Sequence, residues 1–275
     1  MMKRFALSLI FALMALVVAS AQFIPMFGPV NPVSVIAYCS AFGYPSAPIS
    51  TMLKAWYDAD SISPCAGSHP TSWADSSGTG NTATFTGGTF TCNSNDLNGH
   101  NTLSVSGASA ATIATSLGNP QTVFVVYNVT SYASSTSYTL FGGTGGAGLQ
   151  YRVTANSGAT GATQQILRES TSLDMPGTLN VTAATWHQGV FANSPSNSPN
   201  TNFLRLDRAI DNSNGATFVG FGNGTNRLFL NAVGNNENFV GKVAALLYYQ
   251  GVSGSALSAT QVTQNECYLY GKYGI

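Results

Sequence analysis

The acidic residues of the chain show no spacing suited to glycoside hydrolysis, which needs two carboxyl groups flanking the scissile bond at a defined separation. No second carboxylate lies two residues away from any of the three glutamates, which are Glu169, Glu237 and Glu266. The two closely spaced aspartate pairs fit turns better than a cleft, and they are Asp58/Asp60 and Asp207/Asp211. The carboxylates therefore predict no catalytic pair.

The three histidines do not rescue a catalytic interpretation. Nucleophilic hydrolysis on a strand-turn-helix elbow would show a G-x-S-x-G motif, which the chain lacks. We expect structural, hydrogen-bonded roles for His69, His100 and His187. The sequence thus predicts no catalytic residue.

One segment has the oxygen spacing of a cation-binding loop. Asp75, Ser77, Thr79 and Asn81 occur at alternate positions, as the first ligands of a calcium loop do. Only Asp75 is charged, and the twelfth position holds no bidentate glutamate. A tight Asx-type turn is therefore the favoured interpretation, with calcium as the alternative and no cofactor required.

Sugar binding needs an aromatic face together with amide or carboxylate groups that bond to hydroxyls. The candidate aromatic residues lie near loops rich in polar residues and are Tyr132, Tyr138 and Tyr151. A polar loop offers Asn235, Asn236 and Glu237. Aromatic residues at strand spacing also serve as core, so both roles stay open for the tyrosines.

Four cysteines, an even number with no C-x-x-C pair, indicate disulfides more than a zinc or redox site. They allow three pairings. We favour Cys65–Cys92, which closes a short loop, together with Cys39–Cys267, which ties the N-terminal segment to the end of the chain. Four free thiols are the alternative.

The N-terminus is typical of a secretory signal. Lys3 and Arg4 precede an apolar run over 5–18, and Ala19-Ser20-Ala21 supplies a cleavage site. A retained membrane anchor is the alternative. We predict a signal peptide over 1–21, a proline-rich leader over 22–51 and a folded domain over 52–275, which makes the protein secreted or cell-surface, with no membrane segment after cleavage.

The charge of the chain excludes some partners. Charged residues make up 7% of the sequence, with ten basic and ten acidic groups. Removing Lys3 and Arg4 with the signal leaves eight basic groups against ten acidic ones. No basic face could release counterions, so nucleic acid is excluded as a partner.

Short β-prone runs alternate with glycine and asparagine turns, which predicts an all-β sandwich. The last of these runs, 239–249, is apolar at both odd and even positions, so we expect both of its faces to be buried. Near the end of the chain, Ser258 and Gln261 form a capping box, and Val262, Leu269 and Tyr273 share one face. This pattern predicts one C-terminal helix, with a stop at Gly271.

Several pieces occur in the order seen in a known superfamily. They are Leu53–Ala59, the WADSSGTGNTAT stretch over 73–84, Leu97–Leu103, Thr122–Val126, Trp186-His187 and the final YLYGKYGI. Together they resemble the laminin-G-like members of the concanavalin A-like lectin/glucanase superfamily. The resemblance implies a two-sheet antiparallel jelly roll with its chain ends near each other. It implies no activity, because this fold carries many functions, and the E-x-D-x-x-E motif of its laminarinase-type glucanases is absent.

These observations favour a non-catalytic extracellular recognition module that binds a glycan or a cell-surface polymer. A structural or assembly protein of an envelope, matrix or virion is the alternative. A glycoside hydrolase with atypical acids is the third hypothesis.

Overall fold

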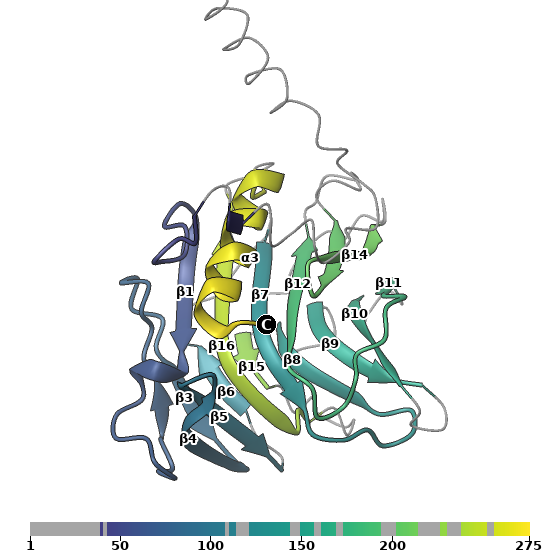
Figure 1. The fold of residues 1–275 in the computed structure, drawn as a ribbon. Coiled ribbons are helices and arrows are strands. Elements are labelled where there is room, and N and C mark those ends of the chain that lie inside the picture. The colour runs from purple at the N-terminus through teal and green to yellow at the C-terminus, as the bar shows by residue number, and fades with distance from the viewer. Residues whose placement is uncertain are drawn as a thin grey trace, which may run out of the picture.

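The computed structural model describes residues 39–40, 43–107, 110–113, 121–143, 149–156, 161–168, 173–193, 202–213, 226–229, 238–251 and 256–275 (Figure 1). The predicted signal peptide and most of the predicted leader lie outside these residues. The described part of the chain is an antiparallel two-sheet β-sandwich with one long helix, which confirms the predicted fold class.

The first sheet, sheet A, carries the helix. Its strand order is β14-β13-β12-β7-β16-β5-β4, and β1 pairs with β16 beside β5. Its strands are β1 (Leu53–Asp58), β4 (Thr89–Leu97), β5 (His100–Ser106), β7 (Gln121–Val129), β12 (His187–Asn193), β13 (Phe203–Leu206), β14 (Ala209–Ser213) and β16 (Gly241–Gln250).

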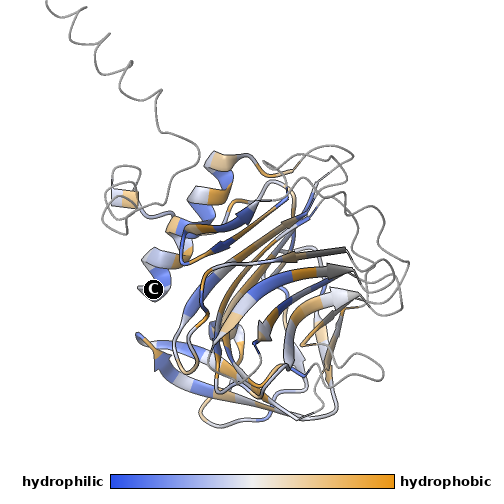
Figure 2. Ribbon diagram, turned by 90° about the vertical axis from the view of Figure 1, so that its right-hand side faces the viewer, coloured by the Kyte–Doolittle hydropathy of each residue, from blue (hydrophilic) through white to orange (hydrophobic). Residues whose placement is uncertain are grey.

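The second sheet, sheet B, faces sheet A and has the order β11-β10-β9-β8-β15-β6-β3-β2. Its strands are β2 (Ser72–Trp73), β3 (Ala83–Thr86), β6 (Ala110–Ile113), β8 (Ser137–Gly143), β9 (Leu149–Ala155), β10 (Ala162–Arg168), β11 (Leu173–Pro176) and β15 (Asn226–Leu228). Apolar (orange) and hydrophilic (blue) residues follow one another along the strands in Figure 2, as expected where one face of a strand is buried.

The core between the sheets is rich in aromatic side chains. Tyr151 packs against Phe141 and Phe191, with ring centroids 5.9 and 5.4 Å apart, and all three are fully buried. Each such side chain contributes roughly 1.5–3 kcal/mol by leaving water. The aromatic content of the sequence thus serves the core first.

The strands at the centre of sheet A are buried on both faces. In β7, Val123 and Val125 face the core between the sheets, while Phe124 and Val126 belong to a second cluster that includes residues of the helix. Strand β16 likewise contributes residues to both clusters, so both of its faces are buried and the expectation for 239–249 is confirmed.

The helix α3 (Ala259–Tyr273) covers the outer face of sheet A (Figure 1). The predicted capping box is present, because the Gln261 backbone N–H donates to Ser258 Oγ and the Ser258 N–H donates to Gln261 Oε1. The predicted stop at Gly271 is wrong. The helix continues to Tyr273, and Gly274 ends it with a left-handed φ of 69°. Gly271 is needed for close packing instead, since a Cβ there would lie 2.8 Å from Cβ of Tyr44.

Both favoured disulfides are present. Cys65–Cys92, at a sequence separation of 27, fixes the preceding loop to β4, and Cys39–Cys267 joins the predicted leader to α3. No helix among the described residues is long and apolar enough to cross a membrane.

Candidate functional site

The outer face of sheet B is polar where β9 and β10 pair. Val153 of β9 is buried in the core, so its neighbours Arg152 and Thr154 lie on the opposite face of the sheet. The register places Gln165 opposite Arg152 and Thr163 opposite Thr154. Four polar side chains therefore stand together on the outside of the sandwich.

A hollow of about 370 Å³ lies over this polar face, and we call it the β9–β11 hollow. Hydroxyl and amide side chains dominate its wall, with a proline and two alanines between them. The lining residues are Thr154, Ala155, Asn156, Ala162, Thr163, Gln165, Pro176, Thr178 and Asn180.

Hydrogen bonds fix Gln165, the amide at the centre of this group. Its Oε1 accepts from Nε of Arg152 at 2.6 Å and from the hydroxyl of Thr154 at 2.7 Å. The acceptor end of the amide is thus occupied, while no bond to a described residue uses its Nε2. Gln165 therefore presents an oriented donor group at the hollow.

Two asparagines are fixed at one end of the hollow. Oδ1 of Asn156 accepts from the backbone N–H of Gly161 at 3.1 Å, and Oδ1 of Asn180 accepts from the N–H of Ala162 at 3.3 Å. A Cβ on Gly161 would lie 2.3 Å from Oδ1 of Asn180, so a glycine is required here for Asn180 to pack. The two amides are held before any ligand arrives.

The wall that includes Thr178 is held by an aspartate from the other sheet. Oδ1 of Asp211, on β14, accepts from the backbone N–H groups of Thr178 and Leu179 at 2.5 and 2.6 Å. Gly177 makes room for this carboxylate, because a Cβ there would lie 2.0 Å from Oδ2. Burial raises the pKa of Asp211, although the bonds from Leu179 and Thr178 oppose the shift. Asp211 positions the wall and is absent from the lining.

The predicted aromatic residues lie behind this site or in the core. Tyr132 and Tyr138 form an edge-to-face pair with ring centroids 5.8 Å apart, and the hydroxyl of half-buried Tyr132 donates to the carbonyl of Val181, next to Asn180. Tyr138 is 4% exposed and Tyr151 is 0% exposed. The expectation of ligand-binding ring faces therefore fails for Tyr138 and Tyr151 in this structure, because both rings are packed among core residues.

The predicted polar loop of Asn235, Asn236 and Glu237 lies outside the described residues. Its proposed contact with a ligand stays a prediction.

Asp75 organises a tight turn. Its Oδ1 accepts from the backbone N–H groups of Trp56 and Ser77, and its Oδ2 accepts from the hydroxyls of Ser77 and Thr79 and the N–H of Asn81. Burial alone would raise the pKa of Asp75, but these bonds outweigh it and lower the pKa. The favoured Asx-type turn is what the structure shows, and calcium binding stays a prediction.

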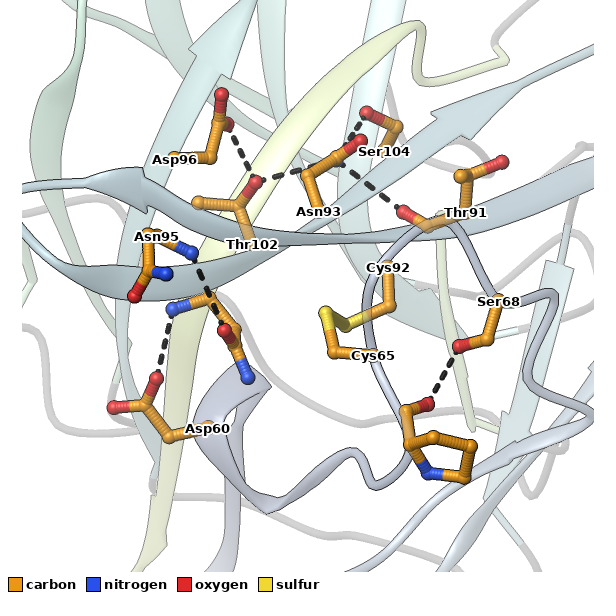
Figure 3. The surroundings of a disulfide bond; sticks show 12 residues. Asp60, Cys65, Ser68, Thr91, Cys92, Asn93, Asn95, Asp96, Thr102 and Ser104 are labelled. Carbon is orange, nitrogen blue, oxygen red and sulfur yellow. Dashed lines mark hydrogen bonds between the residues drawn. A yellow bond between two sulfur atoms is a disulfide. The ribbon is translucent and has the colours of Figure 1, made fainter.

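Four other described carboxylates form ion pairs with basic side chains and do not line the hollow. Asp58 and Asp60 contact Lys272, Asp96 contacts Lys242, and Glu266 contacts Arg205. Figure 3 shows Asp96 accepting from Thr102 on the side of β4 and β5 opposite the Cys65–Cys92 disulfide. Within the described part of the chain, no group of three or more His, Cys, Asp or Glu residues could hold a metal ion.

The histidines have the structural contacts expected of them. Nδ1 of buried His187 lies 2.8 Å from Oδ2 of Asp207, and its Nε2 contacts the backbone of Thr182. Nδ1 of His100 lies 2.7 Å from Oδ2 of Asp60. His69 bonds to the carbonyl of Phe90.

Sequence reasoning missed the residues that line the β9–β11 hollow. A signal existed, because a strand that buries Tyr151 and Val153 must place Arg152 and Thr154 on its other face. The partner of that strand could not be read from the sequence, however. Gln165 and Asn180 become candidates only when β10 pairs with β9 and the 178–180 segment lies alongside.

The described fold resembles that of solved structures with little sequence identity to this chain. Domain 4 of AbnA, a GH43 extracellular arabinanase from Geobacillus stearothermophilus, superposes with a TM-score of 0.56 at 17% identity over 78% of this chain and 98% of that one. Trypanosoma rangeli sialidase in complex with the inhibitor DANA gives 0.54 at 10% identity over 89% of this chain. This chain spans about a third, 35%, of the sialidase.

At these identities the likeness shows the β-sandwich fold alone. No protein-family model and no curated protein sequence matches the chain.

Proposed function

We propose that this protein is a non-catalytic, extracellular carbohydrate-binding domain and that the β9–β11 hollow is its binding site. The observation that carries the proposal is the hollow itself, where amide and hydroxyl side chains are held in place by bonds to the protein. Fixed polar groups lose little conformational freedom when a ligand binds, which favours affinity.

The chemistry of the wall suits a sugar. Each sugar hydroxyl both donates and accepts, so it pairs with the NH₂ of Gln165 or Asn180 and with the hydroxyls of Thr163 and Thr178. Pro176 offers an apolar surface for a ring face. No charged side chain is among the lining residues, and the nearby guanidinium of Arg152 donates to Gln165.

The structural neighbours add support by analogy. Domain 4 of the arabinanase is in complex with arabinotriose, and this chain matches nearly the whole of that domain. The sialidase is an enzyme seen with sialic acid and its analogues, and this chain matches a minor part of it. A glycan partner is consistent with both, although a fold alone assigns no ligand.

The placement of the acids supports binding over hydrolysis. Hydrolysis needs two carboxyl groups about 5–9 Å apart across the bond that breaks. None of the seven carboxylates whose side chains are described lines the hollow, and Asp211 beside it serves two backbone N–H groups.

Two further parts of the proposal concern family and location. The ordered sequence pieces and the observed sandwich support membership of the concanavalin A-like superfamily. The predicted signal over 1–21 and the two disulfides support export, because disulfides form and persist in oxidising compartments.

The test is a glycan array probed with exported full-length protein, run with and without EDTA and paired with a reducing-sugar assay on each bound glycan. We expect binding that EDTA leaves unchanged and no release of reducing ends. Absence of binding on the array would move the assignment to the structural class, and release of reducing ends would make the protein a hydrolase.

A further inference from the structure

A second hollow, of about 440 Å³, lies where β3 of sheet B meets β4 of sheet A, and we call it the β3–β4 hollow. It shares no lining residue with the β9–β11 hollow. Figure 1 shows β3 and β4 at the lower left of the molecule and β9 to β11 at the right. Its lining residues are His69, Pro70, Thr71, Phe85, Gly87, Gly88, Thr89 and Phe90.

The β3–β4 hollow offers the aromatic ring that the first one lacks. The half-buried Phe85 ring stacks on Phe90 with centroids 4.0 Å apart and planes 6° from parallel. Phe90 is 5% exposed and belongs to the core, so it holds Phe85 by one face. A ring supported in this way is a rigid apolar surface at the edge of the hollow.

Polar groups stand around that ring. Nδ1 of exposed His69 lies 3.0 Å from the carbonyl oxygen of Phe90 and 3.3 Å from the hydroxyl of Thr91. A carbonyl oxygen can only accept, so the shorter contact requires the proton on Nδ1. In the neutral imidazole Nε2 is then an acceptor, and no bond to a described residue uses it. Thr71 and Thr89 add exposed hydroxyls that both donate and accept.

The loop between β3 and β4 has no side chains that would obstruct a ligand. Gly87 and Gly88 connect the strands with φ values of 64° and 52°, where residues with a Cβ are strained. The backbone of this loop is therefore directly accessible beside Phe85.

The wall of the β3–β4 hollow is fixed before binding. The segment before Thr71 is joined to β4 by the Cys65–Cys92 disulfide (Figure 3). The N–H of Cys92 also donates to the carbonyl of Ser68 at 2.9 Å. The N–H of Phe85 donates to the carbonyl of Thr71 at 2.9 Å, which joins the same segment to β3. A preformed site loses less entropy on binding than a site that must order.

From these observations we infer that the β3–β4 hollow is a second saccharide-binding subsite, in which the sugar ring stacks on Phe85 and its hydroxyls bond to His69 Nε2 and to Thr71 or Thr89. The choice of a saccharide rests on the proposed function of the first hollow. Two separate subsites let one domain hold a glycan chain at two points or bridge two chains, which strengthens binding to a polymer more than to a short oligosaccharide.

The test is an NMR titration of exported, ¹⁵N-labelled protein with arabinotriose and with the trisaccharide that binds best on a glycan array. We expect the amide signals of Gly87, Gly88 and Thr89 to shift with one affinity, and those of Thr163 and Gln165 with another. Phe85→Leu should weaken the affinity at the β3–β4 hollow about tenfold and leave the affinity at the β9–β11 hollow unchanged. His69→Ala, which leaves the Phe85–Phe90 stack intact, should also weaken binding at the β3–β4 hollow alone.

The control is Tyr44→Leu, which removes an aromatic ring that is 45% exposed and lies in neither hollow, and both affinities should stay the same. Shifts at Thr163 and Gln165 alone would overturn the second subsite and leave the proposed function standing. Shifts at Gly87 to Thr89 alone would support the second subsite and overturn the first. No shift at either place with either sugar would overturn both.

Discussion

Oε1 of Glu266 lies 3.1 Å from Nε of Arg205, with 1% of the glutamate side chain and 17% of the arginine side chain exposed. Arg208 stands nearby with its guanidinium carbon 4.5 Å from the ring centroid of Tyr270, so a buried acid on α3 faces two cations from the β13–β14 hairpin. Burial raises the pKa of Glu266 even though Arg205 and Arg208 oppose the shift.

This shift has a definite sign for stability. A raised pKa in the folded state means that protonation favours folding, so the contribution is complete below the ordinary value of about 4.3 and is lost as pH rises through the folded pKa. We expect the melting temperature to fall as the pH rises from about 4.3 through the folded pKa of Glu266, and to fall less in Glu266→Gln. A Glu266→Gln curve parallel to that of the wild type would contradict this role of Glu266.

Asp75 should act in the opposite direction. Its pKa is lowered, so its contribution is present above about 3.9 and is lost as pH falls through the folded pKa. Asp75→Asn should lower the stability at pH 7 by about 2 kcal/mol, because hydrogen bonds to a charged acceptor are replaced or lost. Chemical denaturation measures this loss, and Ser77→Ala is the matched control, with a smaller loss expected since it removes one hydroxyl donor.

The same variant separates the turn from a calcium site. Both oxygens of Asp75 already accept bonds from the protein, five in all. We therefore expect the wild-type melting temperature to be the same in calcium and in EDTA. A rise with calcium that Asp75→Asn abolishes would show that the turn holds the ion.

The fold was largely predictable because local signals decided it. Ser258 and Gln261 specify a helix start through two bonds within one turn, and the apolar run at β16 requires cover on both faces. The stop at Gly271 could not be excluded from sequence, because the reason for that glycine is Tyr44, more than 200 residues away.

The candidate site was much less predictable. Tyr151 carries an aromatic ring of the kind that stacks on sugars, but the register of β9 points this side chain into the core. Gln165 and Asn180 meet only through pairing of distant segments, and Asp211 reaches the same wall from the other sheet. Such placements depend on tertiary structure that periodicity does not encode.

The Cys65–Cys92 disulfide should contribute strongly to stability. We expect the double variant Cys65→Ala/Cys92→Ala to lose about 2–5 kcal/mol, as is typical of removing a native bridge. Non-reducing peptide mapping of the exported protein should recover Cys65 linked to Cys92. Recovery of either peptide linked to Cys39 or Cys267 would contradict the pairing.

The helix cap offers a smaller effect with a clear control. Ser258→Ala should lower the stability by about 1 kcal/mol, because the N–H of Gln261 loses its acceptor at the first turn of α3. Thr263→Ala, on the same helix but bonded only to the carbonyl of Ala259, should change stability less. Equal melting temperatures for Ser258→Ala and the wild type would mean that the cap contributes nothing.

The most direct test of the proposed carbohydrate site is the affinity of Gln165→Ala/Asn180→Ala for the array's best-bound oligosaccharide, measured by titration calorimetry. Each substitution removes one oriented amide, and a hydrogen bond contributes about 0.5–1.5 kcal/mol, so the double variant should bind roughly tenfold more weakly or worse. The melting temperature of the double variant shows whether it folds. Tyr44→Leu, which lies in neither hollow, is the control variant and should bind as the wild type does. An affinity equal to that of the wild type in the folded double variant would contradict the assignment of the β9–β11 hollow as the binding site.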